Sequence, residues 1–250
     1  MELDLLTYGL LFLVGGFAGF VDSIAGGGGI ITLPALLAVG IPPHQALATN
    51  KLQSSFGSLT AVANYTRLGM VKPAELFEGV MATLIGAAGG AWIVQLFSAD
   101  FLESLIIVML IFIFLYTALS PKLGYEAGSH KMSPRVFYGI FGLLIGFYDG
   151  FFGPGTGSFW TMALIVLLGL DLKRATAQTK LFNFTSNIVS FAVFASSGLM
   201  LWTVGIVMGV GQIVGAYLGS TLVHKKEVGF IRVFFLIVVL ATILRLIAAG

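Results

Sequence analysis

The sequence predicts an all-α polytopic membrane protein built from two inverted repeats, each a re-entrant or broken glycine-rich hairpin followed by three transmembrane helices. Three observations lead to this fold class. Hydrophobic residues make up 58% of the 250-residue chain and charged residues only 10%, whereas a soluble domain carries about 25% charged residues. Apolar runs long enough to cross a bilayer fill nearly the whole length. The second half also repeats the first at an offset of about 128 residues.

The repeat is visible in short matching stretches. The sequence GFVD at 19–22 aligns with GFYD at 146–149, and QALATNKLQSSFGS at 45–58 aligns with RATAQTKLFNFTSN at 174–187. Further on, a pair of glycines at 86 and 90 aligns with a pair at 215 and 219. We therefore expect a first transmembrane repeat at 1–120, a cytoplasmic connector at 121–134 and a second, inverted transmembrane repeat at 135–250.

Each repeat begins with two apolar arms around a glycine-rich break. The arms are expected at 5–21 and 30–39, and at 135–149 and 157–169. An arm of about 10–17 residues is roughly 15–25 Å long as a helix, which reaches the middle of a membrane without crossing it comfortably. Three spans follow in each repeat, expected at 44–67, 75–96 and 101–119, and at 172–196, 201–223 and 228–248.

Loop charges predict the orientation, because cytoplasmic loops are enriched in lysine and arginine. The loop with Arg67 and Lys72 is expected in the cytoplasm, whereas its counterpart at 196–201 has no charge and is expected outside. Three spans and one returning hairpin make an odd number of crossings, so the second repeat is inverted. Both termini are then expected on the outer side.

The glycine-rich breaks are the first candidate binding elements. Non-helical backbone is tolerated at membrane depth only inside protein or beside water, and a helix that starts there directs free N–H groups and a positive dipole end inward. Gly27, Gly28, Gly155 and Thr156 are therefore predicted to bind a small anion. The alternative is that these glycines only allow tight helix packing.

Two lysines within predicted spans are the second candidate, because charges at membrane depth are costly and usually functional. Each lysine shares a helix face with polar residues at i+3 and i+7. The predicted anion-binding set is Asn50, Lys51, Ser54 and Ser58 in the first repeat and Lys180, Asn183 and Asn187 in the second. The alternative is that the lysines extend their ammonium groups to the headgroups.

Asp22 and Asp149 occupy equivalent positions before the two glycine runs. Three roles remain open for them: pairing with the lysines, carrying a coupling proton, or capping the following helix. Gln212 is interpreted as a tie between helices, and Trp160 as an interface anchor or lipid-facing residue.

Several function classes are excluded or not supported. The chain has no cysteine, and its three histidines have no partners at metal-ligand spacing, so no metal or cofactor is predicted. A net charge of +2 without a basic cluster gives no indication of nucleic-acid binding. An intramembrane enzyme is disfavoured because the sequence contains neither HExxH nor GxSxG.

Three stretches carry a resemblance to a known family. They are GFVDSIAGGGGIITLPALLAVGIPPHQALATNKL in the first half, and GFYDGFFGPGTGSF and ATAQTKLFN in the second half. They resemble the sulfite exporter TauE/SafE family. The resemblance covers essentially the full chain. It implies a multi-pass permease of the bacterial inner membrane for a small organosulfur or sulfur-oxyanion substrate, such as sulfite or a sulfonate. The repeats suggest alternating access, with protons as an optional coupling ion. A passive anion channel and a non-transporting scaffold remain alternatives, and a homo-oligomer is compatible with the sequence.

Overall fold

The computed structural model describes residues 3–102, 104–106, 108–109, 112 and 131–225. Over these residues the chain is helical and contains no strand. In chain order the helices are α1 (Leu5–Ala25), α2 (Gly28–Ala38), α3 (Pro43–Arg67), η1 (Pro73–Leu76), α4 (Phe77–Ile93), η2 (Val94–Leu96), α6 (Pro134–Phe151), α7 (Thr156–Leu168), α8 (Leu172–Ala195) and α9 (Trp202–Lys225). The predicted span 101–119 and the connector lie largely outside the described residues, and the span 228–248 lies entirely outside them.

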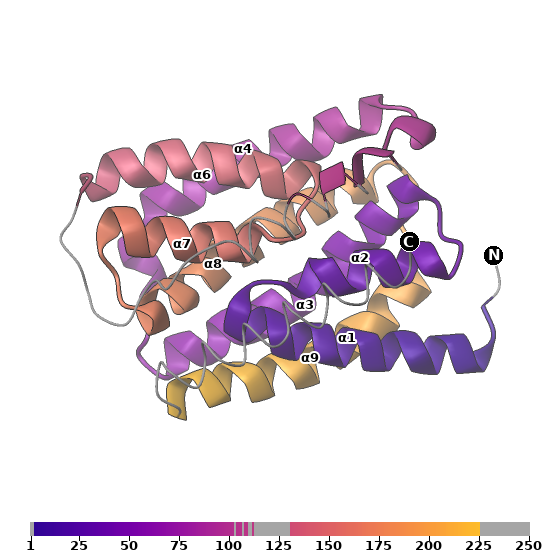
Figure 1. Ribbon diagram of the computed structural model, residues 1–250, viewed down its shortest axis with the longest axis horizontal. Coiled ribbons are helices and arrows are strands. Elements are labelled where there is room, and N and C mark those ends of the chain that lie inside the picture. The colour runs from indigo at the N-terminus through magenta and orange to yellow at the C-terminus, as the bar shows by residue number, and fades with distance from the viewer. Residues whose placement is uncertain (1–2, 103, 107, 110–111, 113–130, 226–250) are drawn as a thin grey trace.

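Two helical hairpins have their tips in contact. Helix α1 ends at Ala25 and is capped by Gly26, whose φ of 76° is readily adopted by glycine, and α2 returns beside α1. Helices α6 and α7 are joined through Gly153 and Gly155, also at positive φ. Figure 1 shows that the two hairpins enter from opposite ends of the molecule. We call residues 26–29 and 152–157 the hairpin tips; a Cβ at Gly26 would lie 2.5 Å from the Gly157 backbone, so the tips touch directly.

The first arm of each hairpin is longer than expected. The sequence predicts arms at 5–21 and 135–149, whereas α1 covers Leu5–Ala25 and α6 covers Pro134–Phe151. Helix α1 continues through Ser23, Ile24 and Ala25 because the residue that ends it, Gly26 in the left-handed conformation, follows Ala25. Its 21 residues make it long and apolar enough to cross a membrane. The returning arms α2 and α7 are short, with 11 and 13 residues, as the sequence predicts.

The helices form an inner pair and two outer pairs. Helices α3 and α8 pack against each other, α1 packs along α9, and α4 packs along α6. Glycines permit both outer contacts: a Cβ at Gly215 of α9 would overlap the carbonyl of Gly16, and one at Gly90 of α4 would overlap that of Phe147. Helices α1 and α6 are equivalent in the two halves of the chain, and so are α4 and α9. The contact between α1 and α9 is therefore the counterpart of the contact between α6 and α4.

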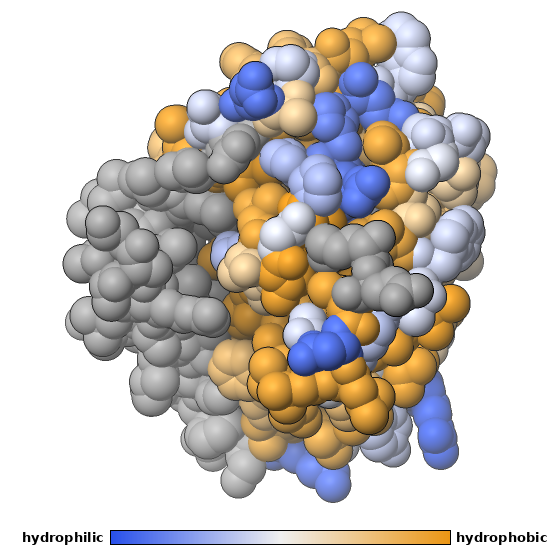
Figure 2. All heavy atoms as spheres, turned by 90° about the vertical axis from the view of Figure 1, so that its right-hand side faces the viewer, coloured by the Kyte–Doolittle hydropathy of each residue, from blue (hydrophilic) through white to orange (hydrophobic). Residues whose placement is uncertain are grey.

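The outside of the bundle is apolar and its inside is partly polar. Large hydrophobic side chains are exposed along α1, α4, α6 and α9, whereas buried polar residues are concentrated on α3 and α8. Apolar residues also cover much of the end of the molecule seen in Figure 2. Three helices are candidate membrane spans by length and hydropathy: Leu5–Ala25, Pro73–Leu96 and Trp202–Lys225. This distribution suits a lipid environment.

One sequence interpretation is wrong. Trp160 is predicted as an interface anchor or lipid-facing residue, but it is fully buried and stacks on Phe182 with ring centroids 4.3 Å apart. Helix α7 is the inner arm of its hairpin, so its aromatic side chain packs against α8 rather than against lipid. Trp92 and Trp202, on the outer helices, are exposed.

Candidate functional site

The two membrane lysines are buried and form ion pairs across the two halves of the chain. Lys51 on α3 is 1% exposed, and its Nζ lies 2.7 Å from Oδ1 of Asp149 on α6. Lys180 on α8 is fully buried, and its Nζ lies 2.9 Å from Oδ2 of Asp22 on α1. Each lysine therefore pairs with the aspartate of the other half. Both ammonium groups point inward to a carboxylate, so neither extends to the headgroups.

The two aspartates have different second partners. Asp149 accepts a hydrogen bond from Ser186 Oγ on its other oxygen, and its backbone carbonyl also accepts one from Lys51. Asp22 accepts a hydrogen bond from the Gly28 N–H at 3.2 Å on Oδ1. Of the roles left open by the sequence, Asp22 thus combines pairing with capping of the first turn of α2, whereas Asp149 pairs without such a cap.

The two pairs also differ in their access to water. The Asp149 side chain is 4% exposed and that of Asp22 is 21% exposed. Burying an ion pair is costly, and leaving one member unpaired costs several kcal/mol. Both members of the Lys51–Asp149 pair are thus shielded from water in this conformation, whereas the Lys180–Asp22 pair has one partly exposed member, Asp22.

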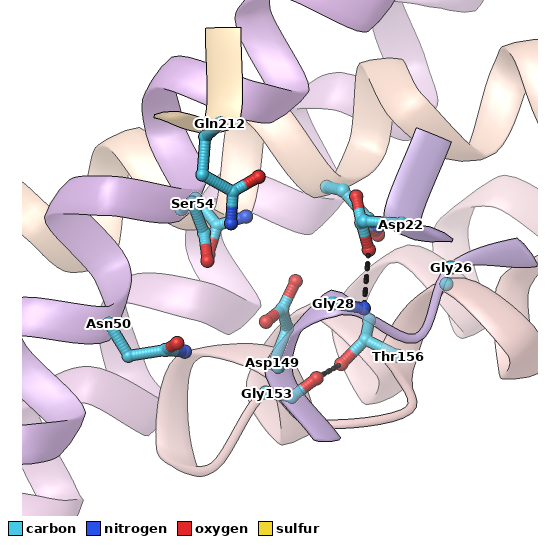
Figure 3. Close-up of a pocket in the computed structure, with 13 residues that line it drawn as sticks. Asp22, Gly26, Gly28, Asn50, Ser54, Asp149, Gly153, Thr156 and Gln212 are labelled. Atoms are coloured by element: carbon cyan, nitrogen blue, oxygen red, sulfur yellow. Dashed lines mark hydrogen bonds between the residues drawn. The ribbon is translucent and has the colours of Figure 1, made fainter. Parts of the chain in front are cut away.

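A small cavity lies between the hairpin tips and the inner helices (Figure 3). Its volume is about 20 Å³, which is only slightly more than the ~10–15 Å³ needed by one water. The lining is almost entirely polar or glycine, and it comes from both halves of the chain. The cavity is lined by Asp22, Gly26, Gly28, Gly29, Asn50, Ser54, Asp149, Gly153, Thr156, Gly157, Asn183, Asn187 and Gln212.

Neutral side chains supply the hydrogen-bonding groups of this cavity. Asn50 Oδ1 accepts hydrogen bonds from Thr32 of the neighbouring helix α2 and from Gln53 of its own helix, at 2.6 and 2.8 Å, so its amide group is held in place. Asn183 is 5% exposed, and its Oδ1 has no hydrogen-bond partner among the described residues. A buried polar atom without a partner is rare in folded proteins, so the Asn183 oxygen is a place where a water or another hydrogen-bond donor would complete the bonding.

The structure brings most of the predicted site residues together. Asp22, Gly28, Asn50, Ser54, Asp149, Thr156, Asn183 and Asn187 all line the cavity. Lys51 and Lys180 do not line the cavity, but each pairs with an aspartate that does. Gly27 and Gly155 are the N-cap residues of α2 and α7 and do not border the cavity.

Ser58 has a different environment from Ser54. It donates a hydrogen bond to the Ser54 carbonyl at 2.7 Å, within its own helix, and it does not line the cavity. The spacing of one face per turn places both serines on the same side of α3. Of these two serines, however, only Ser54 lines the cavity beside the hairpin tips.

Sequence reasoning missed two polar residues of the site, Gln212 and Ser186, and four glycines that line the cavity, Gly26, Gly29, Gly153 and Gly157. Gln212 lines the cavity while its Nε2 donates to Gln53 Oε1, so it ties α9 to α3 as expected and also borders the site. Ser186 holds the Asp149 carboxylate. Its position one residue before Asn187 was the available signal, because a polar residue so deep in a span needs a partner. In the described part of the chain, no group of three or more histidine, aspartate or glutamate residues could hold a metal ion.

Comparison with known proteins adds independent information. The family model described as "Sulfite exporter TauE/SafE" matches residues 11–246. "Probable membrane transporter protein YfcA" of Escherichia coli (strain K12) is 45% identical over 233 residues, covering 93% of this chain and 87% of that protein. "Probable membrane transporter protein ORF9" of Sinorhizobium sp is 44% identical, covering 95% of this chain and 91% of that protein. A "Probable membrane transporter protein" of Haemophilus influenzae is 42% identical, covering 93% and 91%. No solved structure matches.

Proposed function

The chain belongs to the sulfite exporter TauE/SafE family, and we propose that it is a secondary transporter that moves a small organosulfur or sulfur-oxyanion substrate across the bacterial inner membrane. Proteins of this family are membrane transporters and not enzymes. The sulfite or sulfonate class of substrate and the mechanism of alternating access are our proposal.

The first part of the proposal is the arrangement in the membrane. We infer that the two halves are inverted repeats with both termini on the periplasmic side. The hairpins that enter from opposite ends, and the exchange of α1–α9 contacts for α6–α4 contacts, support this inference. Two inverted units related by a pseudo-two-fold axis in the membrane plane can exchange their conformations, which opens the site to one side or to the other.

The observation that carries the transport mechanism is the pair of crossed ion pairs beside the cavity. Each lysine is neutralised by an aspartate of the opposite half, so a movement of one half against the other changes both pairs. A substrate anion would bind among the neutral donors of Asn50, Asn183 and Asn187 and the first turns of α2 and α7. Contact between the two tips, and a cavity scarcely larger than one water, favour a gated carrier over an open channel.

Ligand-dependent stability of the detergent-purified protein tests this proposal. Sulfite, thiosulfate, isethionate, sulfoacetate, taurine, sulfate, nitrate and acetate would be added in turn. A ligand present at 100 times its dissociation constant stabilises the folded state by about 2.7 kcal/mol. We expect a selective rise in melting temperature with the sulfur anions. A chain that responds to none of them would contradict the substrate class.

Two serines provide a matched comparison for the same assay. Ser54→Ala removes a cavity hydroxyl, whereas Ser58→Ala removes a hydroxyl that bonds only within its own helix. We expect Ser54→Ala to reduce the shift caused by the anion and Ser58→Ala to retain it. Equal shifts in both variants would mean that the anion binds elsewhere.

A further inference from the structure

The difference between the two ion pairs indicates which carboxylate exchanges a proton during transport. Asp22 and Asp149 both line the cavity, but the Asp22 side chain is 21% exposed, whereas that of Asp149 is 4% exposed and is held by Lys51 and Ser186. Water can therefore approach Asp22 in this conformation far more readily than Asp149.

The charges around the cavity are balanced before any anion enters. Both lysines are already matched by carboxylates, and the remaining side chains that line the cavity are neutral. An added anion would bring an uncompensated negative charge next to Asp22 and Asp149, in surroundings of low dielectric constant. Anion entry without an uncompensated charge therefore requires that one of the two carboxylates first lose its negative charge.

We propose that anion binding is coupled to protonation of Asp22, which releases Lys180 to balance the anion while the Lys51–Asp149 pair stays closed. This inference rests on the proposed transport function. One proton from the bulk solution adds to the Asp22 carboxylate and cancels its charge, the ion pair with Lys180 separates, and the ammonium group then balances the anion. By the equivalence of the halves, Asp149 and Lys51 take these roles in the opposite conformation.

The titratable groups near Asp22 in the described residues are few. Lys180 on α8 pairs with it directly, and Tyr65 on α3 lies close enough to interact with its charge. Asp149 on α6 lines the same cavity and is paired with Lys51 on α3. Helices α2 and α7 carry no titratable side chain, and on α9 they are Tyr217, which is 50% exposed, and His224 and Lys225 in the last turn. Asp22 is therefore the carboxylate whose protonation releases Lys180.

The affinity for isethionate at different pH values tests this coupling. A sulfonate keeps its charge between pH 5.5 and 8, so any pH dependence comes from the protein. For one linked proton, the wild-type dissociation constant should rise towards tenfold per pH unit on the alkaline side. We expect Asp22→Asn, which imitates the protonated acid, to bind with no pH dependence, whereas Ser58→Ala, which changes no charge and lies outside the cavity, should keep the slope. Loss of the slope in Asp149→Asn alone would overturn the proposal.

A second measurement needs no substrate and remains informative if a variant misfolds. The wild-type protein would be treated with a water-soluble carbodiimide and a small amine, and the labelled carboxylates quantified by mass spectrometry. We expect Asp22 to be labelled several times faster than Asp149; equal or reversed rates would overturn the assignment. Isethionate binding without a pH slope would refute the coupling alone, whereas no binding at any pH would refute the proposed function and the coupling with it.

Discussion

The crossed ion pairs predict a specific pattern of stability, which is clearest for Lys51 and Asp149. Both side chains are almost fully buried, at 1% and 4% exposure, with 2.7 Å between Nζ and Oδ1. Removing one member of such a pair leaves a buried charge and typically costs 3–5 kcal/mol. We expect Lys51→Met and Asp149→Asn each to lower the free energy of unfolding by about 3–5 kcal/mol.

The double variant should be much less destabilised than the sum of the two single variants, because it leaves no unpaired charge. A coupling energy of about 3 kcal/mol is at the upper end of the range for residues in contact. The Lys180–Asp22 pair should show a smaller coupling of about 2 kcal/mol, since the partly exposed Asp22 can be solvated after its partner is removed.

Reversible unfolding in mixed detergent and SDS micelles, followed by circular dichroism, measures these free energies. The exposed pair Lys72–Glu75, with side chains 72% and 67% exposed, is the control. Neutralising it should change stability by about 0.5 kcal/mol or less. If the costs of Lys51→Met and Asp149→Asn simply add, the two residues do not stabilise one another and the reasoning about the site is refuted.

Two further predictions concern packing and topology. Gly215→Ala should destabilise the protein by about 1–3 kcal/mol, because the added Cβ would overlap the Gly16 carbonyl. The control is Gly139→Ala, which should be neutral or stabilising because nothing lies within 4 Å of the added Cβ. Equal effects of the two substitutions on the melting temperature would contradict the close α1–α9 contact. The chain has no native cysteine, so Met70→Cys and Leu199→Cys can be labelled individually in intact cells with an impermeant maleimide. We expect labelling of position 199 from outside and of position 70 only after permeabilisation; labelling from the same side would refute the inverted repeats.

The sequence predicts which residues form the site better than it predicts which of them pair with one another. Matching the halves identifies Lys51 with Lys180 and Asp22 with Asp149, and the glycine runs predict the breaks that become the hairpin tips. Spacing along one chain cannot say which aspartate meets which lysine, because that depends on how the halves face each other. The structure pairs each lysine across the halves.

The remaining misses have the same physical origin. Helical periodicity places Ser54 and Ser58 on one face, but the depth of the hairpin tips decides that only Ser54 borders the cavity. Trp160 was misjudged because hydropathy cannot distinguish an inner apolar helix from a lipid-facing one. Gln212 lies at the site because α9 packs against α3, which is a tertiary contact between the two halves of the chain.

Counterflow in sealed proteoliposomes tests the central claim most directly. Vesicles that contain the purified protein would be loaded with unlabelled isethionate and diluted into a trace of labelled isethionate. A carrier that exposes one site alternately to each side predicts transient accumulation of label above equilibrium and saturation of the flux at high concentration. Linear, unsaturable entry without accumulation would indicate a channel, and no entry beyond empty vesicles would indicate a non-transporting protein; either result would contradict the account.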